Sequence, residues 1–288
     1  MILNVEAKTN FVKLLILFAL SFSGKKECLF LCHYISQNIS ERYVNINWYL
    51  FPVNRNPNCI SMNTKLIFNF VLAILSWFIG ILPANGQTFS VRFDLADLCR
   101  KNQFETINRQ LSWFYENDKK AVRLSKSKDE GIAWIKGVQF SNGTIEIDIR
   151  GKDIFQESFT GIAFHGSDID TLDAVYFRPF NFQSTDSVRR THAVQYISHP
   201  EFPWSVLREK YAGKYENGVT PSPDGNEWFH IRIVVQYPDV AVYVNGSDIP
   251  CLSIKKLNGR RTGKIGLWAG NNSDGDFANL VISTTRKR

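Results

Sequence analysis

After Trp113, apolar and polar residues alternate in short runs that are separated by turn residues. These runs predict β-strands at residues 121–124, 133–135, 143–149, 160–164, 174–177, 192–197, 228–236, 240–244, 264–269 and 277–283. Many short strands between turns, with little helical periodicity, are typical of a β-sandwich or barrel. Asn245-Gly246 follows one of these runs directly and is a strong hairpin signal. The pattern therefore predicts an all-β domain.

One short N-terminal helix is expected within residues 95–111, with Asp94 placed to cap its first turn. We expect residues 87–288 to form a single domain, because neither a repeat nor a linker interrupts them. A core of this size does not need disulfides. Cys99 and Cys251 are the only cysteines in this part of the chain. In an exported protein they could form a disulfide, and two buried thiols are the alternative.

The first 86 residues have a different pattern. Residues 66–82 are an uncharged apolar run, preceded by Lys65 and followed by the small residues Ala84 and Gly86. This order predicts a signal peptide at residues 62–86, cleaved before Gln87, and hence a secreted or periplasmic protein. A membrane anchor is the alternative, because the run is at the lower limit of a spanning length. Residues 1–61 are interpreted as a gene-model extension or a disordered leader, with translation starting at residue 62.

Composition changes this picture in one respect, the charge. The 288 residues are 44% hydrophobic and carry 34 Lys and Arg against 27 Asp and Glu, a net charge of +7. Residues 1–86 hold seven of the basic and three of the acidic residues, which leaves 27 against 24, or +3, after the cleavage site. The remaining basic clusters lie at one turn and at the C-terminus without interleaved aromatic residues. Nucleic acid is therefore not expected as a partner, and no stable membrane span is expected in the mature protein.

Several segments carry a family resemblance. They are residues 140–151 and 158–164, then residues 228–235, 242–246, 263–268 and 276–282. Together they resemble the strands of concanavalin A-like lectin/glucanase domains. Over residues 113–283 the chain is most similar to bacterial secreted LamG-like and 3-keto-disaccharide hydrolase domains (domain of unknown function 1080). The resemblance implies a jelly-roll β-sandwich of two antiparallel sheets and a carbohydrate ligand. Fold alone does not establish function.

The glucanases of this superfamily place catalytic carboxylates on one strand in a Glu-x-Asp-x-Glu pattern, which alternation puts on one face. This chain has Glu146-Ile-Asp148-Ile-Arg150 instead. A guanidinium is always protonated and cannot exchange the proton that the reaction needs. A glucanase mechanism at this strand is therefore not expected.

Alternation nevertheless predicts a polar sheet face opposite Ile145, Ile147 and Ile149. If the strands are neighbours, this face collects Glu146, Asp148, Arg150, His165, Tyr176, Arg178 and Gln195. Candidate acid/base residues are Glu146, Asp148 and His165, and candidate ligand-binding residues are Arg150, Tyr176, Arg178 and Gln195. Charged groups and aromatic rings on a concave sheet are suited to sugar binding. A salt-bridged solvent face is the alternative, since outward strand faces are ordinarily polar.

The long connection between residues 180 and 226 offers two more candidate ligand-binding residues, His199 and Trp204. The prolines beside Trp204 suggest a rigid stacking platform. Alternatively, Phe202 and Trp204 pin the loop to the sandwich. His230 lies in an alternating strand and is interpreted as structural.

Residues 271–276 are rich in oxygen ligands around a glycine, which makes Asp274 and Asp276 candidate ligands for a structural Ca²⁺. Turns rich in Asn and Asp also occur without a metal. No cofactor is otherwise implied.

Two functions remain open. The first is a non-catalytic module that binds a glycan on the concave sheet face. The second, implied by the resemblance, is a glycoside hydrolase of the 3-keto-disaccharide hydrolase type that lacks the Glu-x-Asp-x-Glu motif.

Overall fold

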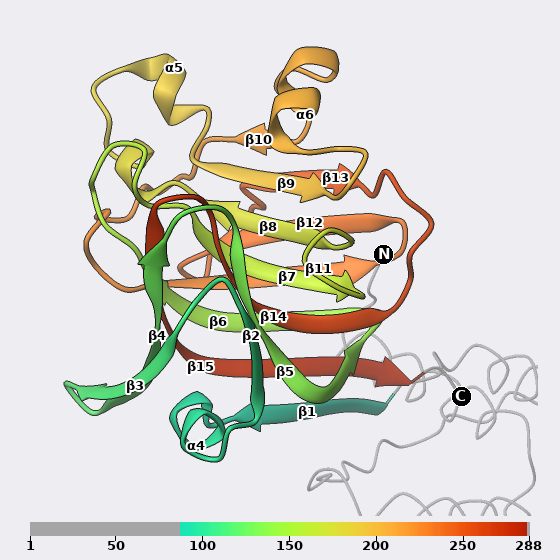
Figure 1. Ribbon diagram of the computed structural model, residues 1–288. Helices are drawn as coiled ribbons and strands as arrows, with labels where there is room; N and C mark the ends of the chain where they lie inside the picture. Colours follow the sequence, from blue (N-terminus) through green and yellow to red (C-terminus); the bar gives the residue numbers. More distant parts are fainter. Residues whose placement is uncertain (1–86, 287–288) are drawn as a thin grey trace, which may run out of the picture. The chain divides into compact units, whose positions relative to one another are not determined.

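The computed structural model describes residues 87–286. The expected leader (residues 1–61) and signal peptide (residues 62–86) lie outside this range. The described residues form two antiparallel β-sheets packed face to face, with short helices at their margins (Figure 1). This arrangement confirms the predicted jelly-roll sandwich.

Both sheets draw their strands from distant parts of the chain. The eight-stranded sheet has the order β13 (Leu252–Lys255), β12 (Asp239–Val244), β11 (Phe229–Gln236), β6 (Gly143–Arg150), β15 (Ser273–Arg286), β4 (Lys119–Ser127) and β3 (Leu111–Glu116), and β1 (Gln87–Phe93) pairs with β15. The seven-stranded sheet has the order β10 (Glu216–Asn217), β9 (Val194–Ser198), β8 (Asp173–Phe177), β7 (Thr160–Gly166), β14 (Gly263–Ala269), β5 (Gly131–Phe140) and β2 (Phe104–Ile107). The last two long strands, β14 and β15, thus lie inside the sheets rather than at their edges.

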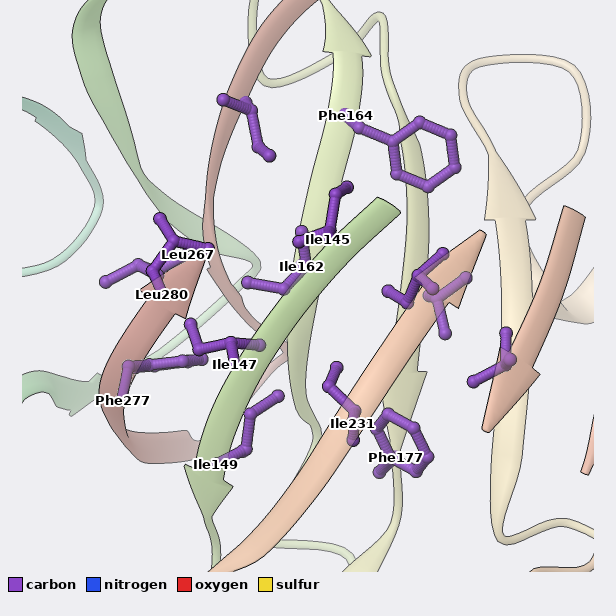
Figure 2. Close-up of a cluster of buried hydrophobic side chains, with 14 of the residues drawn as sticks. Ile145, Ile147, Ile149, Ile162, Phe164, Phe177, Ile231, Leu267, Phe277 and Leu280 are labelled. Atoms are coloured by element: carbon purple, nitrogen blue, oxygen red, sulfur yellow. The ribbon is translucent and has the colours of Figure 1, made fainter. Parts of the chain in front are cut away.

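The main core lies between the two sheets, as Figure 2 shows. Ile145, Ile147 and Ile149 project from β6 and are fully buried, as their alternation predicts. They meet Ile162 and Phe164 of β7, together with apolar side chains of β8, β11, β14 and β15. Burial of such large apolar side chains contributes about 1.5–3 kcal/mol each.

All the strands predicted from the alternating pattern are present, most of them one to several residues longer than expected. The pattern did not identify β1, β2, β3, β10 or β13. These strands lie at sheet edges or are very short. They show only part of the apolar alternation that marks a buried strand face, so the pattern does not reveal them.

The predicted helix at residues 95–111 is much shorter in the structure. Helix α4 spans Leu95–Arg100, and Asp94 is confirmed as its N-cap, since its side chain accepts a hydrogen bond from the Asp97 backbone N–H at 2.9 Å. The rest of the segment forms β2 and the start of β3. Phe104 is buried in the main core opposite Ile135 of β5, so pairing at the sheet edge overrides local helical preference.

The Asn245-Gly246 signal is confirmed as a tight turn with positive φ at both residues, 50° and 72°. The backbone N–H of Ser247 closes the turn by donating to the carbonyl of Val244 at 3.1 Å. The turn begins the connection from β12 to β13, whose ladder starts at Leu252.

Cys99 and Cys251 are both free thiols. Each thiol contacts a backbone carbonyl, that of Leu111 for Cys99 and that of Val242 for Cys251. Burial raises the pKa of Cys251 to about 12. The structure therefore shows two thiols rather than a disulfide.

Three further helical segments connect strands of the seven-stranded sheet: the 3-10 helix η1 (Pro179–Asn181), α5 (Ser187–Arg190) and α6 (Trp204–Lys210). In Figure 1, α5 and α6 lie near β10 at the edge of the sandwich. Among residues 87–286, no helix has the length and apolar character needed to cross a membrane.

Candidate functional site

The outer face of the seven-stranded sheet carries a second apolar layer. One set of directly paired residues runs across it: Trp268 of β14, Gly161 of β7, Tyr176 of β8, Gln195 of β9 and Glu216 of β10. We call this set the outer row. Its neighbours along each strand, such as Leu267 and Val175, point into the main core. The outer row is thus the opposite face of strands whose inner face holds the two sheets together.

Gly161 makes the centre of the outer row possible. A Cβ atom at this position would lie 2.1 Å from the Val175 carbonyl oxygen, so no side chain fits. The flanking rings of Trp268 and Tyr176 come together instead, with centroids 4.9 Å apart and planes tilted by 37°. Both side chains are almost completely buried, and burial raises the pKa of Tyr176 to about 12. The Tyr176 hydroxyl is therefore neutral and acts only through hydrogen bonds.

Gln195 is fully buried beside this ring pair. Its Oε1 accepts hydrogen bonds from the Tyr176 hydroxyl at 3.0 Å and from the Arg178 guanidinium. Because a guanidinium only donates, the amide oxygen must face Arg178, and Nε2 must point elsewhere. Nε2 has no hydrogen-bond partner. A buried donor without a partner costs about 1–3 kcal/mol, so this group is suited to an incoming acceptor.

Glu216 closes one end of the outer row with a cluster of basic side chains. Its carboxylate is buried and lies 2.8 Å from Arg208 Nη2 and 2.8 Å from His192 Nδ1, with Arg178 at 3.8 Å. Burial alone would raise the Glu216 pKa, but the hydrogen bonds and charge of Arg208, aided by His192 and Arg178, lower it. Glu216 is therefore ionised and holds Arg178 against Gln195.

Glu130 and His199 lie beside Trp268 at the other end. His199 Nε2 is 3.4 Å from Glu130 Oε2 and makes no hydrogen bond. Burial raises the Glu130 pKa, although the charge of His199 and the nearby Trp268 N–H act against this shift. Trp268 Nε1 also lacks a hydrogen bond of good geometry. A carboxyl with a raised pKa next to an imidazole can exchange protons with a bound molecule.

The structure brings together four of the residues proposed from sequence: Tyr176, Arg178, Gln195 and His199. Trp204 lies at the margin of this group, where the Arg208 guanidinium sits 5.4 Å from its ring centroid. Trp204 is 48% exposed, so it does not pin the loop. Phe202 pins the loop to the sandwich instead, because its side chain is partly buried in the second apolar layer.

The expected single polar face is wrong, because β6 is not a neighbour of β7. It pairs with β11 and β15 in the other sheet, so Glu146, Asp148 and Arg150 lie on the opposite side of the sandwich. Arg150 bonds Asp276 and Glu116, and Asp148 accepts from Lys119, His230 and Asn279. The salt-bridged solvent face was the correct interpretation for this strand, and His230 forms part of it.

Asp274 and Asp276, the candidate calcium ligands, also belong to this ion-paired face. Asp276 is bonded by Arg123 at 2.6 Å and by Arg150 at 2.8 Å, and Asp274 by Lys152 at 2.5 Å. No group of three His, Cys, Asp or Glu side chains within residues 87–286 could hold a metal. A calcium ion here would have to displace these basic side chains, and its binding stays a prediction.

His165 lies apart from both faces, in a buried polar cluster with Lys256 and Asp173. Its Nε2 faces the Ser141 carbonyl oxygen at 2.7 Å, and a carbonyl only accepts, so Nε2 carries the proton. Nδ1 then accepts from the Lys256 ammonium, which also bonds Asp173 at 2.8 Å. Burial, reinforced by the Lys256 charge, lowers the His165 pKa to about 4. With both nitrogens occupied, His165 links strands rather than exchanging protons with a ligand.

Sequence reasoning missed Trp268, Glu130 and Glu216. Trp268 was detectable, because Leu267 points into the core and alternation turns the next residue outward. Glu130 lies in the short connection between β4 and β5, and Glu216 lies in a two-residue strand, where no local pattern marks them.

Comparison with known proteins identifies a family and several solved structures with a similar fold. A model of the family described as 3-keto-alpha-glucoside-1,2-lyase-like domain matches residues 101–283. No curated protein matches the chain. Among solved structures, the carbohydrate-binding module CBM66 from Bacillus subtilis is 13% identical, covering 64% of this chain and 92% of that chain, with a TM-score of 0.42.

Two other similar solved structures are a protein of unknown function with a galectin-like fold and a protein named for glycosyl hydrolase activity. The first, from Bacillus subtilis, is 12% identical over 70% of this chain and 99% of that chain, with a TM-score of 0.47. The second, named as a putative glycosyl hydrolase from Parabacteroides distasonis, is 11% identical over 63% of this chain and 88% of that chain, with a TM-score of 0.40. Since the family model spans more than half of the sequence, the chain belongs to the family of 3-keto-alpha-glucoside-1,2-lyase-like domains.

Proposed function

We propose that this protein binds a carbohydrate on the outer row. The observation that carries the proposal is the unpartnered, fully buried Gln195 Nε2 next to the Trp268 and Tyr176 rings, which contact each other. A sugar ring packs its C–H face on an aromatic ring, and its hydroxyl oxygens accept hydrogen bonds from such donors. Family membership supports a glucoside as the ligand, because the family is described by its relation to a 3-keto-alpha-glucoside lyase.

The test compares one tryptophan from each outer face. Titration calorimetry with methyl α-glucoside and its 3-keto derivative should detect binding to the full chain. Trp268→Leu should weaken that binding about tenfold, because stacking on the outer row is lost. Trp228→Leu is the matched control, since Trp228 stacks against Lys119 and Arg150 on the ion-paired face.

A second variant separates binding from folding. Gln195→Glu keeps the oxygen that accepts from Arg178 and replaces the free donor by an acceptor. Its thermal unfolding should remain cooperative, while affinity for the glucoside falls. Undiminished affinity in Gln195→Glu and Trp268→Leu, or an equal loss in Trp228→Leu, contradicts the proposal.

A lyase or hydrolase acting on the bound sugar is the second candidate, favoured by the Glu130–His199 pair. Breaking a glycosidic bond by elimination requires one group to remove a proton from carbon and another to protonate the departing oxygen. A carboxyl and an imidazole that face each other at 3.4 Å can divide these tasks. Release of methanol from the 3-keto methyl glucoside should then depend on Glu130 and persist in Glu146→Gln, whose carboxyl lies on the other sheet.

We also propose that the protein is exported. The proposal is supported by the order of Lys65, the apolar run at residues 66–82 and the small residues before Gln87. N-terminal sequencing of the protein recovered from outside the cytoplasm should begin at Gln87. Recovery of an uncleaved, membrane-bound chain would favour the anchor instead.

A further inference from the structure

Aromatic side chains continue from the outer row to the rim of the sandwich. The Tyr176 ring meets Phe159 at 6.2 Å between centroids, Phe159 meets Phe180 at 5.4 Å, and Phe180 meets Phe155 at 5.6 Å. Phe155 lies in the connection between β6 and β7, and Phe180 lies in η1. Tyr176 and Phe180 are buried, at 2% and 4% exposure, Phe159 is partly buried, and Phe155 at the end of the series is 56% exposed. The rings therefore connect the buried site to solvent.

The outer end of this series is apolar. Ile154, next to Phe155 in the chain, is 47% exposed, so two large apolar side chains are exposed together here. Large apolar side chains exposed near one another mark binding surfaces more often than their scattered counterparts do.

Arg189 holds the Phe155 ring in place. Its guanidinium lies 4.3 Å from the ring centroid and donates to Asn181 Oδ1 at 3.2 Å and to the Phe180 carbonyl at 3.0 Å. These bonds anchor the guanidinium in the fold and tie α5 to η1. Phe155 is thus a supported ring that keeps more than half of its surface in solvent.

We propose that Phe155 and its apolar neighbours form a subsite for the aglycone of a glycoside whose sugar occupies the outer row, and that this aglycone is a planar apolar group. The inference rests on the proposed function and names the substrate class of the same site. A second sugar would need fixed polar partners for its hydroxyls, whereas Nε and Nη2 of Arg189, which supports the Phe155 ring, are already bonded within the fold. An aryl group needs only ring faces and apolar contact.

Calorimetry with two glucosides tests the inference on the full chain. 2-Naphthyl α-glucoside should bind about five- to tenfold more tightly than methyl α-glucoside. Phe155→Ala should remove this preference and leave the affinity for methyl α-glucoside unchanged. Phe155→Tyr should retain the preference, because the ring remains. Ile249→Ala is the matched control, since Ile249 is 77% exposed in the connection between β12 and β13.

The outcomes separate this inference from the proposed function. If methyl α-glucoside binds and the naphthyl group adds no affinity, or if the preference survives in Phe155→Ala, the aglycone subsite is refuted and sugar binding stands. If the protein prefers maltose to the naphthyl glucoside through Phe155, the rim binds a second sugar and the inference is likewise wrong. If neither glucoside binds, the proposed glucoside function is refuted, and the inference that rests on it is refuted as well. Free 2-naphthol binding as tightly as its glucoside would show an apolar site unconnected with the outer row.

Discussion

On the eight-stranded sheet, charged side chains that point outward are matched with one another. Asp276 lies between Arg123 and Arg150, and Asp148 is held by Lys119 and His230. On the seven-stranded sheet, the equivalent face is mostly aromatic and buried, and its polar groups are only partly matched. Gln195, Trp268 and His199 each keep a buried nitrogen without a hydrogen bond.

The two faces differ in how much of their hydrogen-bonding capacity is left unsatisfied. A carboxylate that already accepts from several cations gains little from a sugar hydroxyl, because those bonds would have to be broken first. Among the described residues, no buried side-chain atom without a partner lies on the outer face of the eight-stranded sheet. A polar strand face therefore indicates a binding site only when its hydrogen-bonding capacity is not already satisfied.

The largest expected effect concerns the stability of the two faces. Glu216→Gln should lower the free energy of unfolding by about 3 kcal/mol, because the buried Arg178 and its neighbours lose their counter-charge. Glu146→Gln on the eight-stranded sheet should change it by less than about 0.5 kcal/mol, since its nearest cation, His230, is 3.9 Å away. Urea unfolding measures both variants. Equal losses would show that the faces do not differ in their dependence on buried charge.

A smaller effect should appear at low pH on the ion-paired face. Burial raises the Asp148 pKa, but hydrogen bonds from His230, Lys119 and Asn279 outweigh it and lower the pKa from 3.8 to about 2. An acid with a lowered pKa stabilises the fold above its unfolded pKa, and this contribution is lost as the pH falls from about 4 to about 2. The loss is about 2 kcal/mol.

Unfolding of wild type and Asp148→Asn across this pH range measures that loss. The variant lacks the titrating group and should show a shallower dependence on pH. Parallel curves would mean that the Asp148 contacts do not favour the ionised form.

The smallest expected effect is a loss of stability as the pH rises, and it concerns Glu130 beside the outer row. Burial raises the Glu130 pKa, so the fold favours the protonated carboxyl. Stability should therefore fall as the pH rises from about 4.5 through the raised pKa. Glu130→Gln should remove this slope and be slightly more stable than wild type at neutral pH. A variant that is less stable at neutral pH would indicate that His199 stabilises the ionised form.

Local alternation was sufficient to predict strand faces but not strand neighbours. Ile145, Ile147 and Ile149 were correctly assigned to the core, and Tyr176 and Gln195 to one outer face. Glu146 and Asp148 were added to that face because alternation is the same in either sheet. Only the crossing of the chain from β6 to the other sheet at β7 separates them.

The family resemblance and the apolar pattern together were enough to predict the jelly roll, because a two-residue period over many short strands has few packing solutions. Such a period says which side chains share a strand face. It does not say which strands are paired. Glu130 and Glu216 lie in segments without such a pattern, so it does not predict their neighbours either. Trp268, Tyr176, Gln195 and Glu216 form one row only in the folded chain, since hydrogen bonding between distant segments sets that register.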